Sequence, residues 1–142
     1  MEPQPTYKRR QLEIILDSNA LFVPIQFRID VREELKVLLN TNFKLVLPLP
    51  IKAELEKLAD TGSPKMRKYA AYALETILTY KQFEIDEDYA GFSPDEAVFQ
   101  TARKRMAPVF TNDRTLRKRL RDINVPVIYV RQKSRLEVDG SI

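Results

Sequence analysis

The sequence predicts a single three-layer α/β/α domain, with helices on both faces of a five-stranded parallel sheet. Five short apolar runs are separated by segments with helical periodicity. Strands that alternate with helices form parallel sheets joined by right-handed crossovers. At 142 residues the chain is long enough for one domain with its own core.

The expected elements follow one another in regular alternation. Strands are predicted at 12–16, 44–47, 82–85, 108–111 and 125–130, and helices at 30–39, 50–59, 64–80, 93–106 and 113–122. The segment before 30 is predicted to be a loop through Pro24. Gly62 ends one helix and Ser63 caps the next, while 93–96 matches a capping box. Residues 1–10 are interpreted as a basic N-terminal tail and 132–142 as a polar C-terminal tail, which leaves 11–131 as the domain.

The composition excludes several classes of chemistry. The chain has no cysteine and no histidine, which removes thiolate nucleophiles, cysteine-based zinc sites and the commonest general base. An enzyme built from this chain would rely on carboxylates, hydroxyls, amines or an oxygen-liking cation, so Mg²⁺ or Mn²⁺ is the expected cofactor. No apolar run has membrane-spanning length, so we expect a cytoplasmic protein with no membrane partner.

Acidic residues follow four of the five predicted strands. Asp17 and Asp113 come directly after the first and fourth strands, and Glu54 and Asp95 lie near the starts of the helices after the second and third. Segments that follow parallel strands meet at one edge of the sheet. Carboxylates gathered there repel one another unless they are protonated or hold a cation. The sequence therefore predicts a site for a hard metal ion.

Helical phase separates these acids from their neighbours. Glu54 lies within the apolar stripe of its helix, and Asp95 and Asp113 are in phase with theirs, whereas Glu56 and Glu96 lie outside. A carboxylate on a core-facing stripe is costly unless it is paired or metal-bound. Favourable charge at a helix N-terminus is the alternative for Asp95 and Asp113, but it leaves Glu54 unexplained.

Basic residues concentrate on the last two predicted helices. The net charge is +4 and the sequence pI is about 9.3. A basic field beside an acidic pocket suits a polyanion whose phosphates approach a metal, although a solvated helix face remains the alternative. The candidate contacts are Arg103, Arg114, Arg117, Lys118 and Arg121.

The acidic segments resemble the motifs of the PIN domain, a family of metal-dependent nucleases. The similarity extends from about residue 12 to 130. Residues 15–21 resemble the first motif, Glu54 within 53–58 the second, Asp95 within 94–98 the third, and Thr111-Asn112-Asp113 the fourth. Glu96 stands where close relatives often carry a second aspartate. The segment 53–58 and the loop lengths are most similar to the branch of ribosomal-RNA-processing PIN proteins and their archaeal relatives, which implies a role in rRNA processing. VapC-type toxins are a neighbouring branch and remain the alternative.

This resemblance implies a strand order of 3-2-1-4-5 and hydrolysis of phosphodiester bonds in single-stranded RNA. Asp17, Glu54, Asp95 and Asp113 would hold the metal, and Asn19 and Thr111 would orient the carboxylates, although ordinary turn and strand-end roles are equally open for those two. The resemblance leaves three protein partners open: a second copy of the chain in a homodimer, an antitoxin, or a ribosome-biogenesis protein.

Other classes of protein place acids in similar positions. Phosphatases of the haloacid dehalogenase type need a second acid two residues after Asp17, where this chain has Asn19. Response-regulator receivers need an acidic pair near the first strand, which is missing, although Asp86 could stand for their acceptor aspartate. An RNA-binding or scaffold module without catalysis is the main non-enzymatic alternative.

Overall fold

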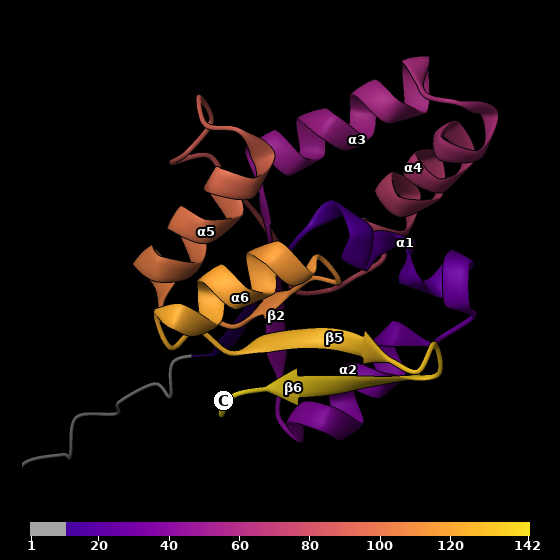
Figure 1. The fold of residues 1–142 in the computed structure, drawn as a ribbon. Helices are drawn as coiled ribbons and strands as arrows, with labels where there is room; N and C mark the ends of the chain where they lie inside the picture. Colours follow the sequence, from indigo (N-terminus) through magenta and orange to yellow (C-terminus); the bar gives the residue numbers. More distant parts are fainter. Residues whose placement is uncertain (1–10) are drawn as a thin grey trace, which may run out of the picture.

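The computed structural model describes residues 11–142 and shows a six-stranded sheet with six helices packed around it (Figure 1). The predicted tail 1–10 lies outside the described residues. The strands are β1 Leu12–Leu16, β2 Phe43–Pro48, β3 Phe83–Asp86, β4 Val109–Phe110, β5 Val127–Arg131 and β6 Arg135–Asp139. The helices are α1 Ser18–Phe27, α2 Val31–Leu39, α3 Leu49–Thr61, α4 Pro64–Ile77, α5 Pro94–Arg105 and α6 Arg114–Asp122.

The sheet has the order β3-β2-β1-β4-β5-β6, and its first five strands are parallel. This confirms the expected α/β class and the order 3-2-1-4-5. Successive crossovers run toward β3 and then reverse toward β5, so right-handed connections put the two groups of helices on opposite faces. Strand β1 lies between β2 and β4, with Leu16 opposite Phe110. The residues that follow β1 and β4 are therefore neighbours.

The C-terminal segment corrects the prediction of a loose polar tail. Residues Arg135–Asp139 form β6, which pairs antiparallel with β5 and buries Leu136 in the core. The turn between the two strands places Gln132 and Lys133 at positive φ, 53° and 58°. Two successive residues at positive φ are typical of tight hairpin turns, which usually contain Asn or Gly. The hairpin was missed because this turn contains neither.

The segment after β1 is also different from the prediction, because a helix replaces the expected loop. Helix α1 contains Pro24 and buries Ala20, Leu21, Phe22 and Val23. A proline inside a helix removes a backbone hydrogen bond, yet burial of this apolar stretch outweighs that loss. Asp17, the N-cap of α1, is thereby held between a strand and a helix.

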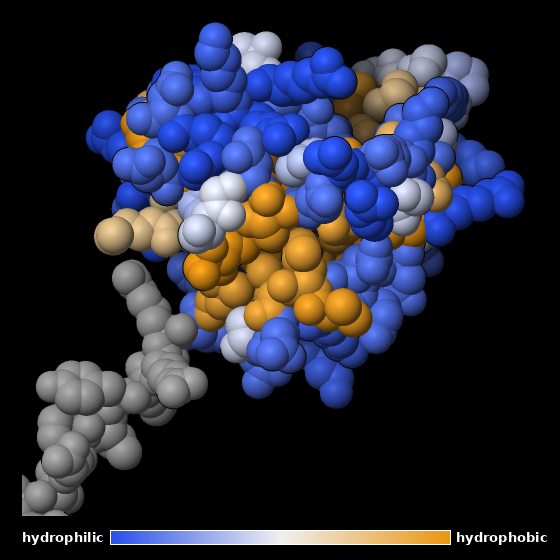
Figure 2. Space-filling model, turned by 60° about the horizontal axis from the view of Figure 1, so that its bottom comes forward, coloured by the Kyte–Doolittle hydropathy of each residue, from blue (hydrophilic) through white to orange (hydrophobic). Residues whose placement is uncertain are grey.

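The core consists of the apolar residues of the central strands together with the inner faces of the helices. No helix within residues 11–142 is long and apolar enough to cross a membrane. Figure 2 shows apolar side chains gathered on the face that carries α2 and β6. A hollow lined by Leu12, Leu38, Leu39, Val138 and Ile142 lies at the amino end of β1, opposite the edge where the acidic residues lie.

Candidate metal centre at the carboxyl edge of the sheet

Asp17 is the most buried acid at the carboxyl edge of the sheet, with 3% of its surface exposed. Its Oδ1 accepts a hydrogen bond from the backbone N–H of Ser18 at 2.8 Å. Its Oδ2 accepts from Asn19 Nδ2 at 3.0 Å and from the Thr111 hydroxyl at 2.7 Å. The carboxylate is therefore held in one orientation, and Oδ1 keeps capacity to accept a further bond.

Burial raises the pKa of Asp17 above its ordinary value, and the negative charges of Asp95 and Glu54 raise it further. Hydrogen bonds from Thr111 and Ser18 act in the opposite direction. Asp95 and Glu54 are therefore near enough to Asp17 for their charges to act on it. A bound cation would relieve this repulsion.

Asn19, in the first turn of α1, and Thr111, directly after β4, surround Asp17. The side-chain oxygen of Asn19 accepts from the backbone N–H of Asn112 at 2.8 Å. The Thr111 hydroxyl accepts from the backbone N–H of Asp113 at 3.1 Å while it donates to Asp17. Both residues thus contact Asp17 and the segment that leads to Asp113, as an orienting role requires.

Asn112 is a member of this cluster that sequence reasoning missed. Its side-chain oxygen accepts from the backbone N–H of Val130 at 2.8 Å. The loop after β4 is therefore fixed to α1 through Asn19 and to β5 through Val130. Its position between Thr111 and Asp113 is the feature of the sequence that could have identified it as a member of the cluster.

The other three acids differ in exposure. Glu54 and Asp113 are half-buried and Asp95 is exposed, so the expectation that Asp95 faces the core is wrong. The first turn of α5 lies at the rim of the sheet, where its side chains reach solvent. Asp113 Oδ1 accepts from the backbone N–H of Leu116 at 3.1 Å and so caps α6, which leaves Oδ2 available. Within residues 11–142, no salt bridge involves any of the four predicted ligands.

The expected capping box of α5 is not formed. Ser93 makes no side-chain capping bond, and Glu96 instead pairs with Arg119 of α6 at 2.6 Å and accepts from Gln100. These contacts lower the pKa of Glu96 to about 2, with Arg119 as the main cause. Glu96, which lies beside Gln100 as its helical phase predicted, therefore fixes α5 to α6 next to Asp95.

The chemistry of the donor set suits Mg²⁺ or Mn²⁺, because all four predicted ligands are carboxylates. In the described part of the chain, however, no three acidic side chains lie close enough together to hold a metal ion. The charges of Glu54 and Asp95 act on Asp17, but the three carboxylates do not surround a common position where an ion could bind. The predicted metal ligands therefore stay a prediction.

The predicted RNA contacts fall into two groups. Arg103, Arg114 and Lys118 are exposed. Arg117 and Arg121 both pair with Asp139 of β6, at 2.9 and 3.2 Å. Arg117 also lies 3.7 Å above the ring of Tyr129, and Arg121 donates to the carbonyl of Val125. These two guanidinium groups hold α6 against the β5–β6 hairpin.

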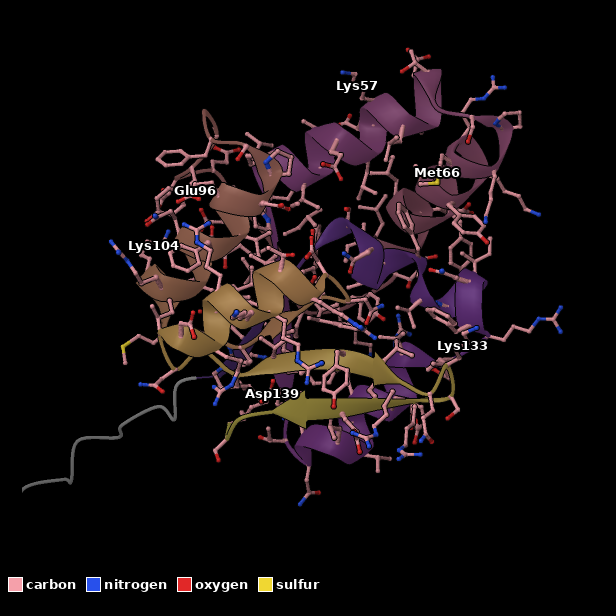
Figure 3. The ribbon with its side chains drawn as sticks, viewed as in Figure 1. Lys57, Met66, Glu96, Lys104, Lys133 and Asp139 are labelled. Carbon is pink, nitrogen blue, oxygen red and sulfur yellow. The ribbon has the colours of Figure 1, made fainter. Side chains whose placement is uncertain are left out.

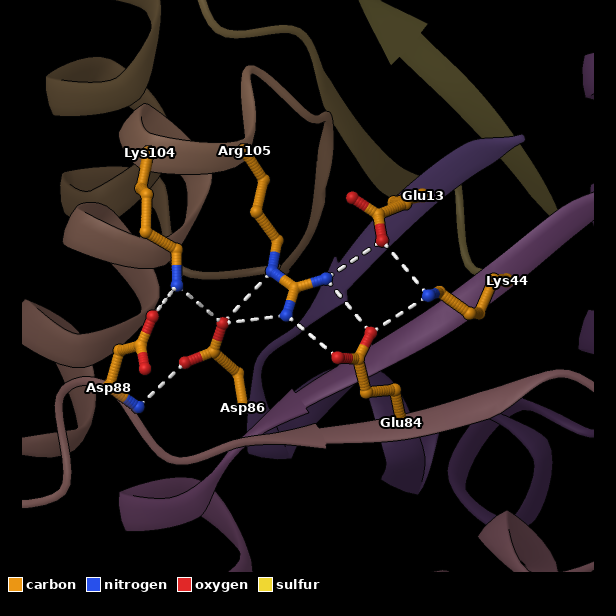
Figure 4. Close-up of polar contacts among 7 residues, drawn as sticks. All are labelled: Glu13, Lys44, Glu84, Asp86, Asp88, Lys104 and Arg105. Atoms are coloured by element: carbon orange, nitrogen blue, oxygen red, sulfur yellow. Dashed lines mark hydrogen bonds and ion pairs between the residues drawn. The ribbon is translucent and has the colours of Figure 1, made fainter. Parts of the chain in front are cut away.

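A second cluster of charges lies between the sheet and the carboxyl end of α5 (Figure 4). Arg105 contacts Glu13, Glu84 and Asp86 at 2.7–2.9 Å. Lys104 contacts Asp86 and Asp88, and Lys44 bridges Glu13 and Glu84. Asp86, whose side chain is 1% exposed, is thus already neutralised. A receiver domain would moreover have the order 2-1-3-4-5, so that reading is excluded.

The fold and the carboxylate edge agree with the comparison to known families. A family model described as a PIN like domain matches residues 14–133. The chain therefore belongs to the PIN-like domain family, as its four motifs indicated.

Curated relatives cover nearly the whole chain. Over 133 residues the sequence is 35% identical to Ribonuclease VapC4 of Methanocaldococcus jannaschii, with 92% of this chain and 98% of the relative covered. It is 24% identical over 125 residues to Ribonuclease VapC9 of Archaeoglobus fulgidus, with 88% and 87% covered. Both names agree with the predicted class of enzyme.

Solved structures extend the similarity to the fold. The PIN domain endonuclease Utp24 superposes with a TM-score of 0.73 at 25% identity, and 92% of each chain is covered. VapBC2 from Rickettsia felis, bound to a promoter DNA fragment, superposes with a TM-score of 0.61 at 17% identity over 84% of this chain and 100% of that one. At that identity the second match supports the fold alone.

Proposed function

We propose that this protein is a divalent-metal-dependent endoribonuclease that hydrolyses phosphodiester bonds in single-stranded RNA. The observation that carries the proposal is the Asp17 cluster. A buried carboxylate is held by Thr111 and Asn19 and repelled by Asp95 and Glu54, in a chain of the PIN-like family. Such an arrangement costs free energy in a protein that does not use it.

In this proposal Asp17, Glu54, Asp95 and Asp113 hold one or two Mg²⁺ or Mn²⁺ ions. When bound, the ion supplies positive charge that lowers the pKa of water and stabilises charge on the scissile phosphate. Asp17 presents its remaining acceptor capacity in a fixed direction because Thr111 and Asn19 hold Oδ2. Asp113 contributes Oδ2, since its Oδ1 caps α6.

Arg114 and Lys118 are the α6 cations that we propose to contact substrate phosphates. They lie one turn apart on an exposed face, and Arg114 directly follows Asp113. Arg117 and Arg121 are less available because Asp139 holds both. We therefore propose that Arg114 and Lys118 are the residues of α6 that contact RNA. Arg103 of α5, which is also exposed, stays a candidate.

The biological role is proposed from the relatives. The 35% identity to a protein named Ribonuclease VapC4 favours a VapC-type toxin, paired with an antitoxin in the cytoplasm. The similarity to the Utp24 endonuclease keeps ribosomal-RNA processing as the second role. In both roles the same carboxylate site of the protein would cleave RNA, so the cleavage reaction can be tested before the biological role is known.

The test is cleavage of labelled single-stranded RNA with Mn²⁺, compared with the same reaction in EDTA. Asp17→Asn and Asp113→Asn should each lower the rate by about 100-fold or more, because a charged ligand is worth several kcal/mol in the transition state. Both substitutions are nearly isosteric, and circular dichroism should show an unchanged fold. Glu56→Gln is the matched control, since Glu56 is exposed and, within residues 11–142, forms a salt bridge with Lys52 alone.

Cleavage that survives EDTA, or equal rates in wild type and Asp17→Asn, would refute the proposed site. Binding of RNA without cleavage by the wild type would favour the RNA-binding module instead.

A further inference from the structure

The α3–α4 hairpin carries a group of lysine and arginine side chains that sequence reasoning did not single out. Lys57 lies near the end of α3, and Lys65, Arg67 and Lys68 lie in the first turns of α4. All four are exposed. Figure 3 shows Lys57 and Met66 on this hairpin, which projects from the body of the molecule.

These four cations differ from most of those on α5 and α6. Lys104, Arg105, Arg117, Arg119 and Arg121 are each held by a carboxylate. Among the described residues, no salt bridge involves any of these four cations. The nearby Glu56 pairs with Lys52, so Asp60 is the acid that partly offsets this surface. A positive charge without a protein partner can neutralise a phosphate without breaking an internal ion pair.

The turn that joins the two helices is fixed by local contacts. Gly62 donates to the carbonyl of Leu58 at 3.0 Å, and a Cβ at this position would lie 2.5 Å from that oxygen. The Thr61 hydroxyl donates to the Lys57 carbonyl at 3.0 Å, and Ser63 caps α4 by accepting from the N–H of Met66 at 3.2 Å. The cations therefore project from a rigid support.

The hairpin is connected to the acidic edge by both of its helices. Glu54 lies one helical turn before Lys57 on α3, a rise of about 4.5 Å along the axis. On α4, the Tyr69 ring packs 5.9 Å from that of Phe22 in α1, the helix that begins directly after Asp17. Lys65 lies 5.5 Å from the same Tyr69 ring. The surface thus begins at the acidic edge and extends away from it.

We infer that the α3–α4 hairpin, through Lys57, Lys65, Arg67 and Lys68, binds the phosphate backbone of the single-stranded RNA next to the cleavage site. This inference rests on the proposed function, because it assigns a path to the substrate of the same site. Contacts of this kind act on phosphates and therefore raise affinity for RNA of any sequence.

The experiment measures binding of a fluorescein-labelled oligouridine by fluorescence anisotropy, in EDTA, over a series of KCl concentrations. Each phosphate contact adds about 0.7 to the slope of log affinity against log salt for a single strand. Lys65→Gln combined with Lys68→Gln should lower that slope by about 1.4 and weaken binding about tenfold at low salt. The matched control is Lys36→Gln combined with Lys81→Gln, which removes the same charge from exposed positions at the amino edge of the sheet and should leave the slope unchanged.

An unchanged slope in the hairpin variant, or an equal loss in the control, would overturn the inference. So would unchanged RNA binding accompanied by lost self-association in sedimentation, because the hairpin would then be a protein contact. Hairpin-dependent binding by a wild type that cleaves no RNA would refute the proposed function alone. Cleavage by a wild type whose hairpin variant binds and cleaves equally well would refute the hairpin assignment alone.

Discussion

The two ends of helix α5 lie beside two sets of carboxylates with opposite electrostatic conditions. At its carboxyl end, Lys104 and Arg105 neutralise Glu84 and Asp86 (Figure 4). At its amino end, Asp95 adds negative charge to the field of Asp17, and within residues 11–142 neither acid has a cation partner in a salt bridge.

The pKa values follow this difference. Hydrogen bonds from Arg105 and Lys44 lower the pKa of Glu84 to about 2. Burial of Asp86 opposes ionisation, but contacts from Lys104, the Asp88 N–H and Arg105 together outweigh it and lower its pKa. Asp17 is also buried, and its pKa is raised. Burial alone therefore does not separate the two sets, whereas the presence of cations does, so the first set stabilises the fold and the second is available to a ligand.

Removal of Arg105 should have the largest effect on stability. Arg105→Met leaves Glu13, Glu84 and Asp86 without their shared donor and should lower the free energy of unfolding by about 2–4 kcal/mol. This is less than the roughly 3–5 kcal/mol expected for a fully buried pair, because Glu84 is 39% exposed. Urea unfolding at neutral pH measures it. Arg103→Met, on an exposed position of the same helix, should change stability by less than about 0.5 kcal/mol. Equal effects in both variants would contradict the structural role of the cluster.

Addition of metal should act on the other set. Mn²⁺ at about 100 times its dissociation constant should stabilise the wild type by about 2.7 kcal/mol, which corresponds to a rise in Tm of about 5–10 °C. Asp17→Asn should lose this rise. In EDTA at neutral pH it should be at least as stable as the wild type, because a raised pKa means that ionised Asp17 opposes folding above that pKa. A Tm of the wild type that does not change when Mn²⁺ is added, or that rises equally in both proteins, would argue against the metal site.

Acidification should have the smallest effect on stability. It acts on the carboxylates that are paired with Arg105, Lys104 and Lys44. The folded-state pKa of Glu84 is lowered from 4.5 to about 2. Its contribution is therefore present above about pH 4.5 and is lost as the pH falls toward 2. Because the side chain is 39% exposed, we expect about 1 kcal/mol or less. Unfolding in urea at pH 7 and pH 3 should show a smaller loss of stability on acidification for Glu84→Gln than for wild type. An identical loss in the two proteins would contradict this assignment.

The positions of the five parallel strands could be predicted because they follow from local patterns, and their order was implied by the resemblance to the PIN family. The alternation of apolar runs indicated the sheet, and the rule that strand ends meet at one edge predicted that Asp17 and Asp113 lie on the same edge, where Thr111 bonds to both. Asn19 and Thr111 were implied by the resemblance to the PIN family, and the structure places both in contact with Asp17. The exposure of Asp95 was not predicted, because helical phase says little about a first turn that lies at the rim of a sheet.

Contacts between segments that are distant in the chain could not be predicted from the sequence. The pairing of Arg117 and Arg121 with Asp139 depends on β6, whose turn lacks the usual residues. The cluster in Figure 4 joins positions that are up to 92 residues apart. The hairpin cations were overlooked because they are spread over two helices, whereas those on α5 and α6 are more concentrated in the sequence.

Strand β6 determines what the sheet offers to other chains. It covers the outer hydrogen-bonding edge of β5 and presents Arg135, Glu137 and Asp139 in its place. Charged side chains on an edge strand discourage the addition of strands from neighbouring molecules. A chain that stopped at residue 131 would leave β5 uncovered and Arg117 and Arg121 without Asp139. It would therefore be expected to aggregate, and at the same time to bind nucleic acid less selectively.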